Sequence, residues 1–227
     1  MTEHAAAVAI ATDVVALALG TDAADPTRLR FLTTRRQRSP FPGSWALPGQ
    51  VISPEDDLEA AARTALAGAG VRDVGHLEQL ATFGQPHRDP RGRIVSVTYL
   101  ALLPRADPDA PAGGGGDARW MPAQDPPALA FDHARILASA VERLQGKLSY
   151  STVAYGLLDA EFTLTELQAV YEAVLGRAID KRNFRKRVLA LGMLTETGRQ
   201  RRGPHRPAQL YRFARPGLEL LDGVITV

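Results

Sequence analysis

The sequence contains no cysteine, which removes several classes of site at once. Without thiols the chain can form no disulfide, no zinc–thiolate centre and no cysteine nucleophile. Long apolar runs are also missing, since the stretch from Ala5 to Gly20 is interrupted by Asp13 and is too short to span a bilayer. The N-terminal residues lack the basic region of a signal peptide. We therefore expect a soluble, cytoplasmic protein that does not interact with membranes.

The net charge is small, but its distribution along the chain is uneven. The formal charge is +2, yet residues 1–129 hold 12 Lys/Arg against 15 Asp/Glu, whereas residues 130–227 hold 15 against 10. Between Lys181 and Arg206 there are nine basic residues and a single acid, Glu196. Such a local excess of positive charge predicts a polyanionic partner for the C-terminal part.

The first part of the chain alternates apolar β-rich segments with one alanine-rich helix. Ser53 is the expected N-cap of this helix and Pro54 its first residue, and the run Gly68–Gly70 is expected to end it. Residues 104–117, with four consecutive glycines, are expected to form a surface loop, and residues 130–148 an amphipathic helix. The expected strands cover residues 6–19, 29–34, 45–51, 78–82 and 94–103.

The second part is predominantly helical in pattern. A threonine N-cap precedes an apolar stripe that includes Leu167, Val170 and Val174, and Gly176 follows it. A second helix is expected over 180–194, followed by a basic loop and a strand over 209–213. We therefore predict an α/β domain over 1–148, with a mixed sheet between helices, and a mostly α winged helix-turn-helix domain over 149–227.

Residues 49–71 follow the Nudix box, G-x5-E-x7-R-E-U-x-E-E-x-G-U, where U is a bulky apolar residue. Gly49, Glu55, Arg63, Gly70 and Val71 match it, but its three metal-binding carboxylates are replaced by Thr64, Ala67 and Gly68. Magnesium needs oxygen ligands beside a diphosphate, and alanine and glycine offer no side-chain oxygen. This resemblance to the Nudix family implies a Nudix fold with a nucleoside-diphosphate pocket, and the replaced carboxylates predict no metal site and no hydrolysis. Gly49 is expected to allow close backbone approach, and Arg63 to lie near the phosphates.

Two further basic segments are candidates for the same pocket. In residues 83–93 the arginines, among them Arg88 and Arg91, offer forked donors suited to phosphate or ribose oxygens. Phe83 could stack on an adenine, although it could equally belong to the core. Arg36 lies in a similar turn, where it could reach a diphosphate or simply contribute surface charge. The five histidines show no metal-ligand spacing, and His133 is expected to pack at the start of a helix.

The helix expected over 180–194 has the pattern of a DNA recognition helix. Phe184, Val188 and Leu191 share one face, Arg182 and Lys186 project from the opposite side, and flanking polar residues adjoin them. Such a helix can dock its apolar side and present the other to phosphates and base edges, although a solvated face is the simpler alternative. The full set of candidate DNA-binding residues is Lys181, Arg182, Asn183, Arg185, Lys186, Arg199, Arg201, Arg202, His205 and Arg206.

These segments together resemble the Nudix-related transcriptional regulator (NrtR) family across nearly the whole chain. The resemblance rests on residues 42–49, 82–84, 88–97, 131–133, 162–167, 180–185 and 206–213. It implies a homodimeric repressor of NAD biosynthesis and salvage genes that binds a palindromic operator in double-stranded DNA. It also implies that the Nudix domain senses ADP-ribose, or a related nucleotide, as an effector without cleaving it and without a cofactor.

Carried over residue by residue, the resemblance places five residues at the ligand site and assigns operator contact to the second domain. The ligand-site residues are Gly49, Glu55, Arg63, Arg88 and Arg91, and the operator contacts are Arg182, Asn183, Lys186 and the wing. Gln50 departs from the family, in which a second glycine is frequent. Two other functions stay open: an ADP-ribose diphosphatase with relocated carboxylates such as Glu59 or Glu78, and a sugar-responsive regulator on the same scaffold.

Overall fold

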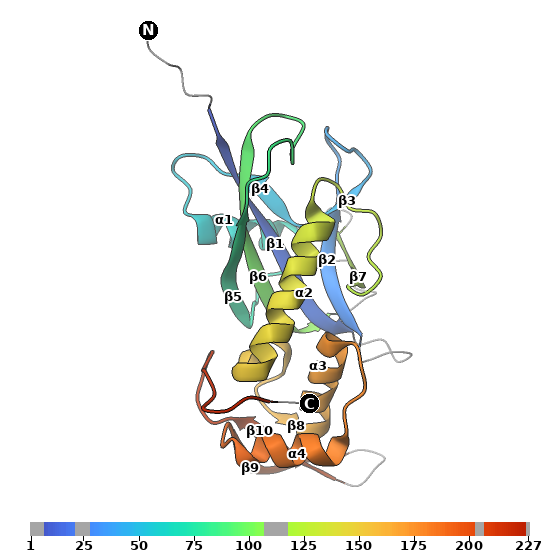
Figure 1. Ribbon diagram of the computed structural model, residues 1–227, viewed down its shortest axis with the longest axis vertical. Helices are drawn as coiled ribbons and strands as arrows, with labels where there is room; N and C mark the ends of the chain where they lie inside the picture. Colours follow the sequence, from blue (N-terminus) through green and yellow to red (C-terminus); the bar gives the residue numbers. More distant parts are fainter. Residues whose placement is uncertain (1–6, 21–27, 107–117, 203–206, 226–227) are drawn as a thin grey trace.

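The structure is a computed structural model that describes residues 7–20, 28–106, 118–202 and 207–225. A seven-stranded sheet with a helix on each side is followed by a smaller helical part with a three-stranded sheet (Figure 1). The strands of the larger sheet are β1 (Ala9–Gly20), β2 (Leu29–Arg35), β3 (Trp45–Ala46), β4 (Gly49–Val51), β5 (His76–Phe83), β6 (Ile94–Ala106) and β7 (Ala118–Pro122).

Strand β1 lies at the centre of the larger sheet. The main strand order is β3-β2-β1-β6-β5, with β4 paired to β1 and β7 paired to β2. β1 runs parallel to β6, with Val15 opposite Leu100, and antiparallel to β2 and β4, so the sheet is mixed. β1 is buried along most of its length, which explains why its sequence is a nearly continuous apolar run.

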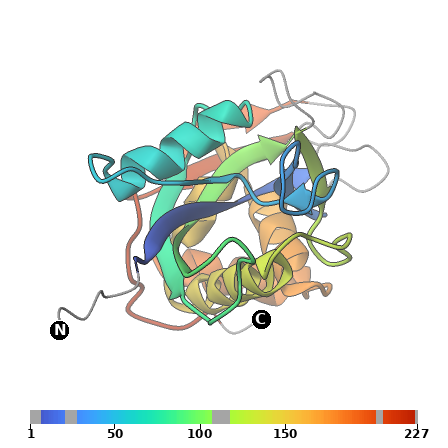
Figure 2. The same cartoon turned by 90° about the horizontal axis from the view of Figure 1, so that it is seen from above.

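The two faces of this sheet are covered by different helices, α1 (Leu58–Gly68) and α2 (His133–Tyr150). Figure 2 shows them on opposite sides of the sheet. Because successive side chains of a strand point to opposite faces, β1 contributes to both cores. Val14 and Ala16 belong to the same buried cluster as Leu66 of α1, whereas Val15 belongs to that of Ile136 of α2. The predicted arrangement, a mixed sheet between helices, is confirmed.

The start of α1 differs from the prediction. The helix begins at Leu58, with Asp57 as N-cap, whose carboxylate accepts a hydrogen bond from the Ala60 amide at 3.0 Å. Ser53 lies in the preceding turn, where its amide donates to the Asp56 carboxylate at 2.7 Å. Two adjacent aspartates offer competing acceptors, and the second of them caps the helix. Pro54 and Glu55 are therefore outside the helix.

The C-terminal part is a winged helix, as predicted. Its strand order is β8-β10-β9, α3 contacts β8 and β10, and α4 contacts α3 (Figure 1). Thr163 and Glu166 form a capping box at the start of α3, and Phe184 and Val188 of α4 are fully buried. The elements are the 3₁₀ helix η1 (Val153–Leu157), β8 (Phe162–Thr163), α3 (Leu164–Leu175), α4 (Lys181–Ala190), β9 (Leu194–Arg201) and β10 (Ala208–Phe213).

Several predicted boundaries are wrong. The second helix of this part ends at Ala190 rather than at 194, because Gly192 adopts a left-handed conformation (φ 64°) and Leu194 already belongs to β9. Residues 104–106, predicted as loop, extend β6, while the rest of that predicted loop lies outside the described residues. The short strand β8 was not predicted, since two residues are too few to produce a β pattern.

No clear break in packing separates the two parts. α2 continues to Tyr150, past the predicted boundary at residue 148, and one buried cluster extends from Val15 and Phe31 of the large sheet to Phe184 and Ile225. The division into residues 1–148 and 149–227 therefore stays a prediction. None of the described helices is long and apolar enough to cross a membrane.

Candidate functional site

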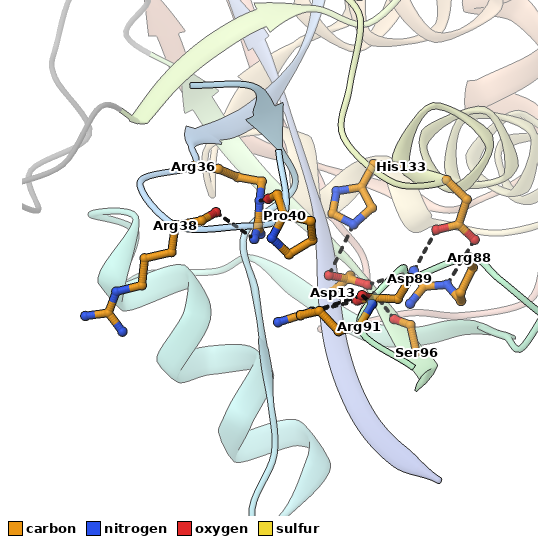
Figure 3. A network of polar contacts seen from close by, with 10 residues as sticks. Asp13, Arg36, Arg38, Pro40, Arg88, Asp89, Arg91, Ser96 and His133 are labelled. Carbon is orange, nitrogen blue, oxygen red and sulfur yellow. Dashed lines mark hydrogen bonds and ion pairs between the residues drawn. The ribbon is translucent and has the colours of Figure 1, made fainter. Parts of the chain in front are cut away.

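A small polar cavity of about 90 Å³ opens where β1, β4 and the start of α2 meet. Its walls come from β1, from β4, from the turns that follow β2 and β5, and from the segment that begins α2. Figure 3 shows how its charged side chains converge from these separate elements. The lining residues are Ala11, Asp13, Arg36, Leu47, Gly49, Gln50, Val51, Arg88, Asp89, Arg91, Phe131 and His133.

Arg88 is held beneath the cavity by two carboxylates. Its side chain is 4% exposed and donates to Asp132 through Nε at 3.0 Å and Nη2 at 2.6 Å, and to Asp13 at 3.4 Å. Burial alone would lower the pKa of Arg88, but the hydrogen bonds and charges of these two aspartates raise it. Arg88 is therefore permanently charged and committed to the protein's own acids.

The buried carboxylate of Asp13 joins this arginine to a histidine and a serine. Ser96 donates its hydroxyl to Asp13 at 2.6 Å, and His133 Nε2 lies 3.6 Å from the other carboxylate oxygen. The Leu47 amide donates to His133 Nδ1 at 2.9 Å, so Nδ1 carries no proton. Burial lowers the pKa of His133, and the neutral ring accordingly carries its proton on Nε2, facing Asp13.

Arg36 and Arg91 both lie close to the ring of Phe131, and all three residues line the cavity. The Arg36 guanidinium carbon lies 4.7 Å from the ring centroid and that of Arg91 5.7 Å. Arg91 donates twice to the carboxylate of Asp89, at 2.9 and 2.6 Å, which compensates much of its charge. Arg36 instead donates to the backbone carbonyls of Pro40 and Arg38. Its charge is thus the least neutralised of the three cavity arginines.

The pKa of Arg36 also indicates that its charge is the least neutralised of the three cavity arginines. Its pKa is lowered, first by burial and then by repulsion from Arg91, and the charge of an anion placed here would offset both effects. For Asp89 burial would raise the pKa, but the hydrogen bonds from Arg91 lower it overall. An anionic ligand would therefore meet Arg36 directly and Arg91 in competition with Asp89.

Two phenylalanines beside the cavity adopt an unfavourable backbone conformation. Phe41 has φ 60° and Phe131 φ 56°, both in the left-handed region that bulky residues rarely occupy. Their rings meet edge to face, with centroids 5.0 Å apart. Backbone strain of this kind is concentrated at binding sites, and here it accompanies an aromatic ring that lies close to two arginines.

The structure brings some of the predicted ligand residues together and leaves others apart. Arg36, Gly49, Arg88 and Arg91 line the cavity. Glu55 is exposed in the turn before α1, and Arg63 is exposed on α1, where it pairs with Glu59 at 2.9 Å. Phe83 is 5% exposed and packs in the core, which was the alternative predicted to adenine stacking. For Glu55, Arg63 and Phe83 the structure therefore gives no contact with the cavity.

Gly49 is required by the close approach of β4 to β1. A Cβ at this position would lie 2.6 Å from the Thr12 carbonyl and would also overlap the carboxylate of Asp13. The glycine therefore lets β4 approach β1 and leaves room for the Asp13 carboxylate.

Sequence reasoning missed Asp13, Asp132 and Phe131 as parts of this site. Asp13 gave a signal, since it is a lone acid inside the apolar run of β1, and a buried charge needs a partner. The partner, Arg88, lies 75 residues away along the chain, which local patterns do not reveal. His133 packs at the start of α2 as predicted and, in addition, lines the cavity.

The positions that hold metal in a complete Nudix box lie on α1, outside the residues that line the cavity. Thr64 donates its hydroxyl to the Ala60 carbonyl at 2.9 Å, and Ala67 and Gly68 bring no side-chain oxygen. Glu59 is engaged by Arg63, and Glu78 by Lys147 and His76. Among the residues that the structure describes, no three His, Asp or Glu side chains form a group able to hold a metal ion.

A second candidate site is the basic face of α4. Lys181, Arg182, Asn183 and Lys186 are exposed on its first turns, opposite the buried Phe184 and Val188. The N-cap Asp180 accepts a hydrogen bond from the Asn183 amide at 2.8 Å, which leaves the Asn183 side chain at the surface. Arg185 is half-buried and donates to the Thr165 hydroxyl of α3 at 3.2 Å.

The predicted wing residues are arranged differently. Arg199 and Arg201 of β9 form ion pairs with Glu161 and Glu166, beside β8 and α3, while Arg202 is exposed. His205 and Arg206 lie outside the described residues. DNA would therefore compete with Glu161 and Glu166 for two of the wing arginines, whereas the α4 face is directly accessible.

Two protein-family models match separate parts of the chain. Residues 12–141 match the NUDIX domain, and residues 154–213 match the NrtR DNA-binding winged helix domain. The ADPR responsive transcriptional repressor NtrR of Acinetobacter baylyi is 37% identical over 195 residues, which are 84% of this chain and 78% of that protein. The two matched families and this relative together cover both candidate sites.

Solved structures and an enzyme are also similar. Shewanella oneidensis NrtR, in complex with a 27mer DNA, is 35% identical with a TM-score of 0.77, covering 90% of this chain and 93% of that one. Its NUDIX domain complexed with ADP ribose is 32% identical with a TM-score of 0.51, covering 61% and 90%. An ADP-ribose pyrophosphatase of Methanocaldococcus jannaschii is 31% identical over 111 residues, 48% of this chain and 63% of the enzyme.

Proposed function

This chain belongs to the NrtR family of Nudix-related transcriptional regulators, and from this premise we propose that it is a DNA-binding repressor whose Nudix domain senses ADP-ribose. ADP-ribose is a fragment of NAD, and the regulated genes are accordingly those of NAD biosynthesis and salvage. A repressor acts where the chromosome lies, so a cytoplasmic location is part of this proposal.

The observation that carries the proposal is the presence, on one chain, of an arginine-lined cavity beside the Nudix box and an exposed basic helix. Arg36 and Arg91 beside Phe131 offer forked donors and an aromatic face, which suit a diphosphate and a ring system. The α4 face offers Arg182, Asn183 and Lys186 to a DNA groove. Shewanella oneidensis NrtR is known in complex with DNA, and its NUDIX domain in complex with ADP ribose.

The chain acts as a homodimer in this proposal. Two winged helices related by a two-fold axis would read the two halves of a palindromic operator, about one helical turn apart. ADP-ribose would favour a relative orientation of the winged helices that no longer matches this spacing. The ligand can change DNA affinity only through its different affinities for the two orientations, commonly about 1–3 kcal/mol.

Sensing without hydrolysis is also part of the proposal. Three residues stand at the metal-ligand positions of the box, and none of them fits magnesium. The Thr64 hydroxyl is hydrogen-bonded to the Ala60 carbonyl, and Ala67 and Gly68 have no side-chain oxygen. Glu59 and Glu78, which could have replaced them, do not line the cavity and are already paired. We therefore assign no metal and no cofactor to the cavity.

Isothermal titration with ADP-ribose, followed by chromatography of the cell contents, tests this proposal. The expected result is binding with ADP-ribose recovered intact in the presence of Mg²⁺ or Mn²⁺. Recovery of AMP and ribose 5-phosphate would instead establish a diphosphatase, the activity of the Methanocaldococcus relative. Absence of binding, with thermal stabilisation by a pentose or sugar phosphate, would establish a sugar-responsive regulator.

A further inference from the structure

The segment that follows the winged helix match, residues 214–225, lies across the end of α2 and is called here the C-terminal strap. Three of its backbone hydrogen bonds hold it at this end of α2: the Thr152 amide donates to the Glu219 carbonyl at 2.9 Å, the Leu221 amide to the Tyr150 carbonyl at 2.8 Å and the Ile225 amide to the Ser149 carbonyl at 2.7 Å. Each bond joins the strap to the last residues of α2 or to the two residues that follow it.

The end of the strap is anchored in the core. Ile225 is 3% exposed and belongs to the same buried cluster as Leu148 of α2 and Tyr171 of α3. These three side chains also line a common cavity of about 240 Å³. A short surface segment is usually fastened at few points, whereas this one is tied by both backbone pairing and apolar burial.

The same strap is bonded to α4. Arg187 donates to the Val224 carbonyl through Nε at 3.0 Å and through Nη2 at 2.5 Å. A Cβ on Gly223 would lie 3.1 Å from Leu191 Cδ2, so the strap runs close to the end of this helix. At about 100° per residue, Arg187 projects some 140° from Arg182 around the helix axis. It thus lies between the exposed basic face and the buried face.

We propose that the C-terminal strap couples α4 to α2, and that Arg187 is a positioning residue for the recognition helix rather than a DNA contact. α2 is 18 residues long, about 27 Å, and reaches from the cavity to the strap. His133 at its first position lines the cavity, and its N-cap Asp132 holds Arg88. A displacement of α2 by ligand would thus reach α4 through the strap.

A parallel contact joins α2 to α3, and the experiment must distinguish the two. The Tyr171 hydroxyl donates to the Leu148 carbonyl at 3.1 Å, and Gln145 donates to the Val174 carbonyl at 2.9 Å. Neither contact involves Arg187. A substitution of Arg187 therefore removes the strap's bonds to α4 and leaves the packing of α2 on α3 in place.

The first test compares Arg187→Gln with wild type in operator binding, with and without ADP-ribose. This readout rests on the proposed function. We expect the ADP-ribose-induced change in operator Kd to shrink at least threefold in Arg187→Gln. It should be unchanged in Arg212→Gln, a matched control at an exposed position of β10. Two results would overturn the proposal. The first is an ADP-ribose-induced change in operator Kd that is the same in Arg187→Gln as in wild type. The second is a slope of log K against log salt that is about 0.9 smaller in Arg187→Gln, as expected for the loss of one phosphate contact.

The second test does not depend on ADP-ribose. Because the chain has no cysteine, a spin-label pair can be introduced cleanly at Ala138→Cys on α2 and Ala190→Cys on α4, both exposed, in protein diluted with unlabelled chains. The α2–α4 distance distribution should broaden when Arg187→Gln is added, while Arg212→Gln leaves it unchanged. A distribution that stays as narrow would overturn the proposal. If wild type shows no response to ADP-ribose, the effector assignment fails and this measurement still decides the role of the strap.

Discussion

Single arginines of the cavity have different tasks, although they lie within one small site. Arg88 is buried between Asp13 and Asp132, so removing it would leave two acids without their cation. Arg36 is bonded to backbone carbonyls and lies over the Phe131 ring, so its charge is available to an anion. Loss of Arg36 should therefore affect ligand binding, and loss of Arg88 should affect folding.

For Arg36→Ala we expect the Kd for ADP-ribose to rise about 10- to 100-fold, because a charge-assisted hydrogen bond contributes about 1.5–3 kcal/mol. Isothermal titration measures this directly. Arg38→Ala is the matched control, since Arg38 is an exposed arginine two residues away that does not line the cavity. Equal Kd values for wild type and Arg36→Ala would remove Arg36 from the ligand site.

For Arg88→Ala we expect a loss of about 3–5 kcal/mol in the free energy of unfolding, the usual cost of breaking a buried ion pair from one side. Urea denaturation measures it as a lower midpoint. Arg88→Lys should lose less, because it retains the charge but not the two-pronged contact with Asp132. A midpoint for Arg88→Ala close to that of wild type would contradict the structural role.

The arginines of the site were identifiable from sequence because their density in Pro- and Gly-rich turns is itself a pattern. The aromatic partner was not. Phe83 and Phe131 look alike in sequence, and what separates them is a backbone conformation: Phe131 has φ 56° and faces Arg36, whereas Phe83 ends β5 inside the core. Neither periodicity nor composition predicts a left-handed phenylalanine, because that conformation is imposed by tertiary contacts.

At the scale of elements, α4 is the clearest functional unit. It buries Phe184 and Val188 and leaves Arg182 and Lys186 in solvent, which is what docking against DNA requires. The wing arginines Arg199 and Arg201 are less available to DNA than the α4 face, because they form ion pairs with Glu161 and Glu166.

Arg182→Ala combined with Lys186→Ala should weaken operator binding and flatten its dependence on salt. Each lost phosphate contact lowers the slope of log K against log salt by about 0.9. Fluorescence anisotropy at several salt concentrations measures both quantities. The charge-matched control is Arg38→Ala with Arg72→Ala, two exposed arginines of the Nudix part. An unchanged slope in the α4 variant would place the DNA surface elsewhere.

Periodicity identified most elements correctly, and local competition for hydrogen bonds explains the errors at their ends. The apolar spacing of α4 was sufficient to orient its two faces. The start of α1 was misplaced because Ser53, Asp56 and Asp57 are all good caps, and only the folded backbone selects Asp57. The end of α4 was misplaced because Leu191 and Leu194, one on each side of Gly192, continue the helical apolar pattern.

At the scale of the whole molecule, a buried polar cluster joins the sheet, α2 and the 3₁₀ helix. Glu78 of β5 is bonded to Lys147 of α2 and lies 3.1 Å from His76 Nε2, whose Nδ1 lies 2.8 Å from the Tyr155 hydroxyl. Burial would raise the pKa of Glu78, but hydrogen bonds to His76 and Lys147 and the charges of both lower it to about 2. This carboxylate therefore stabilises the junction of the two parts in its ionised form.

The sign of the pH dependence follows from that lowered pKa. Glu78 contributes stability above its ordinary pKa of 4.5, and this contribution is lost as the pH falls towards 2. In urea unfolding from pH 7 to 2, wild type should lose up to about 3 kcal/mol more than Glu78→Gln across that window. Glu142→Gln, at an exposed position of α2, is the control. Parallel curves for wild type and Glu78→Gln would show that the junction does not depend on this charge.

One measurement tests ADP-ribose as the effector of DNA binding: the affinity of the full chain for its operator with and without ADP-ribose at fixed salt. A duplex selected by the protein from a random pool supplies the operator. ADP-ribose should weaken operator binding about 5- to 150-fold, whereas AMP and ribose 5-phosphate at the same concentration should not. An identical Kd with and without ADP-ribose, for a duplex bound specifically, would contradict the assignment of ADP-ribose as the effector.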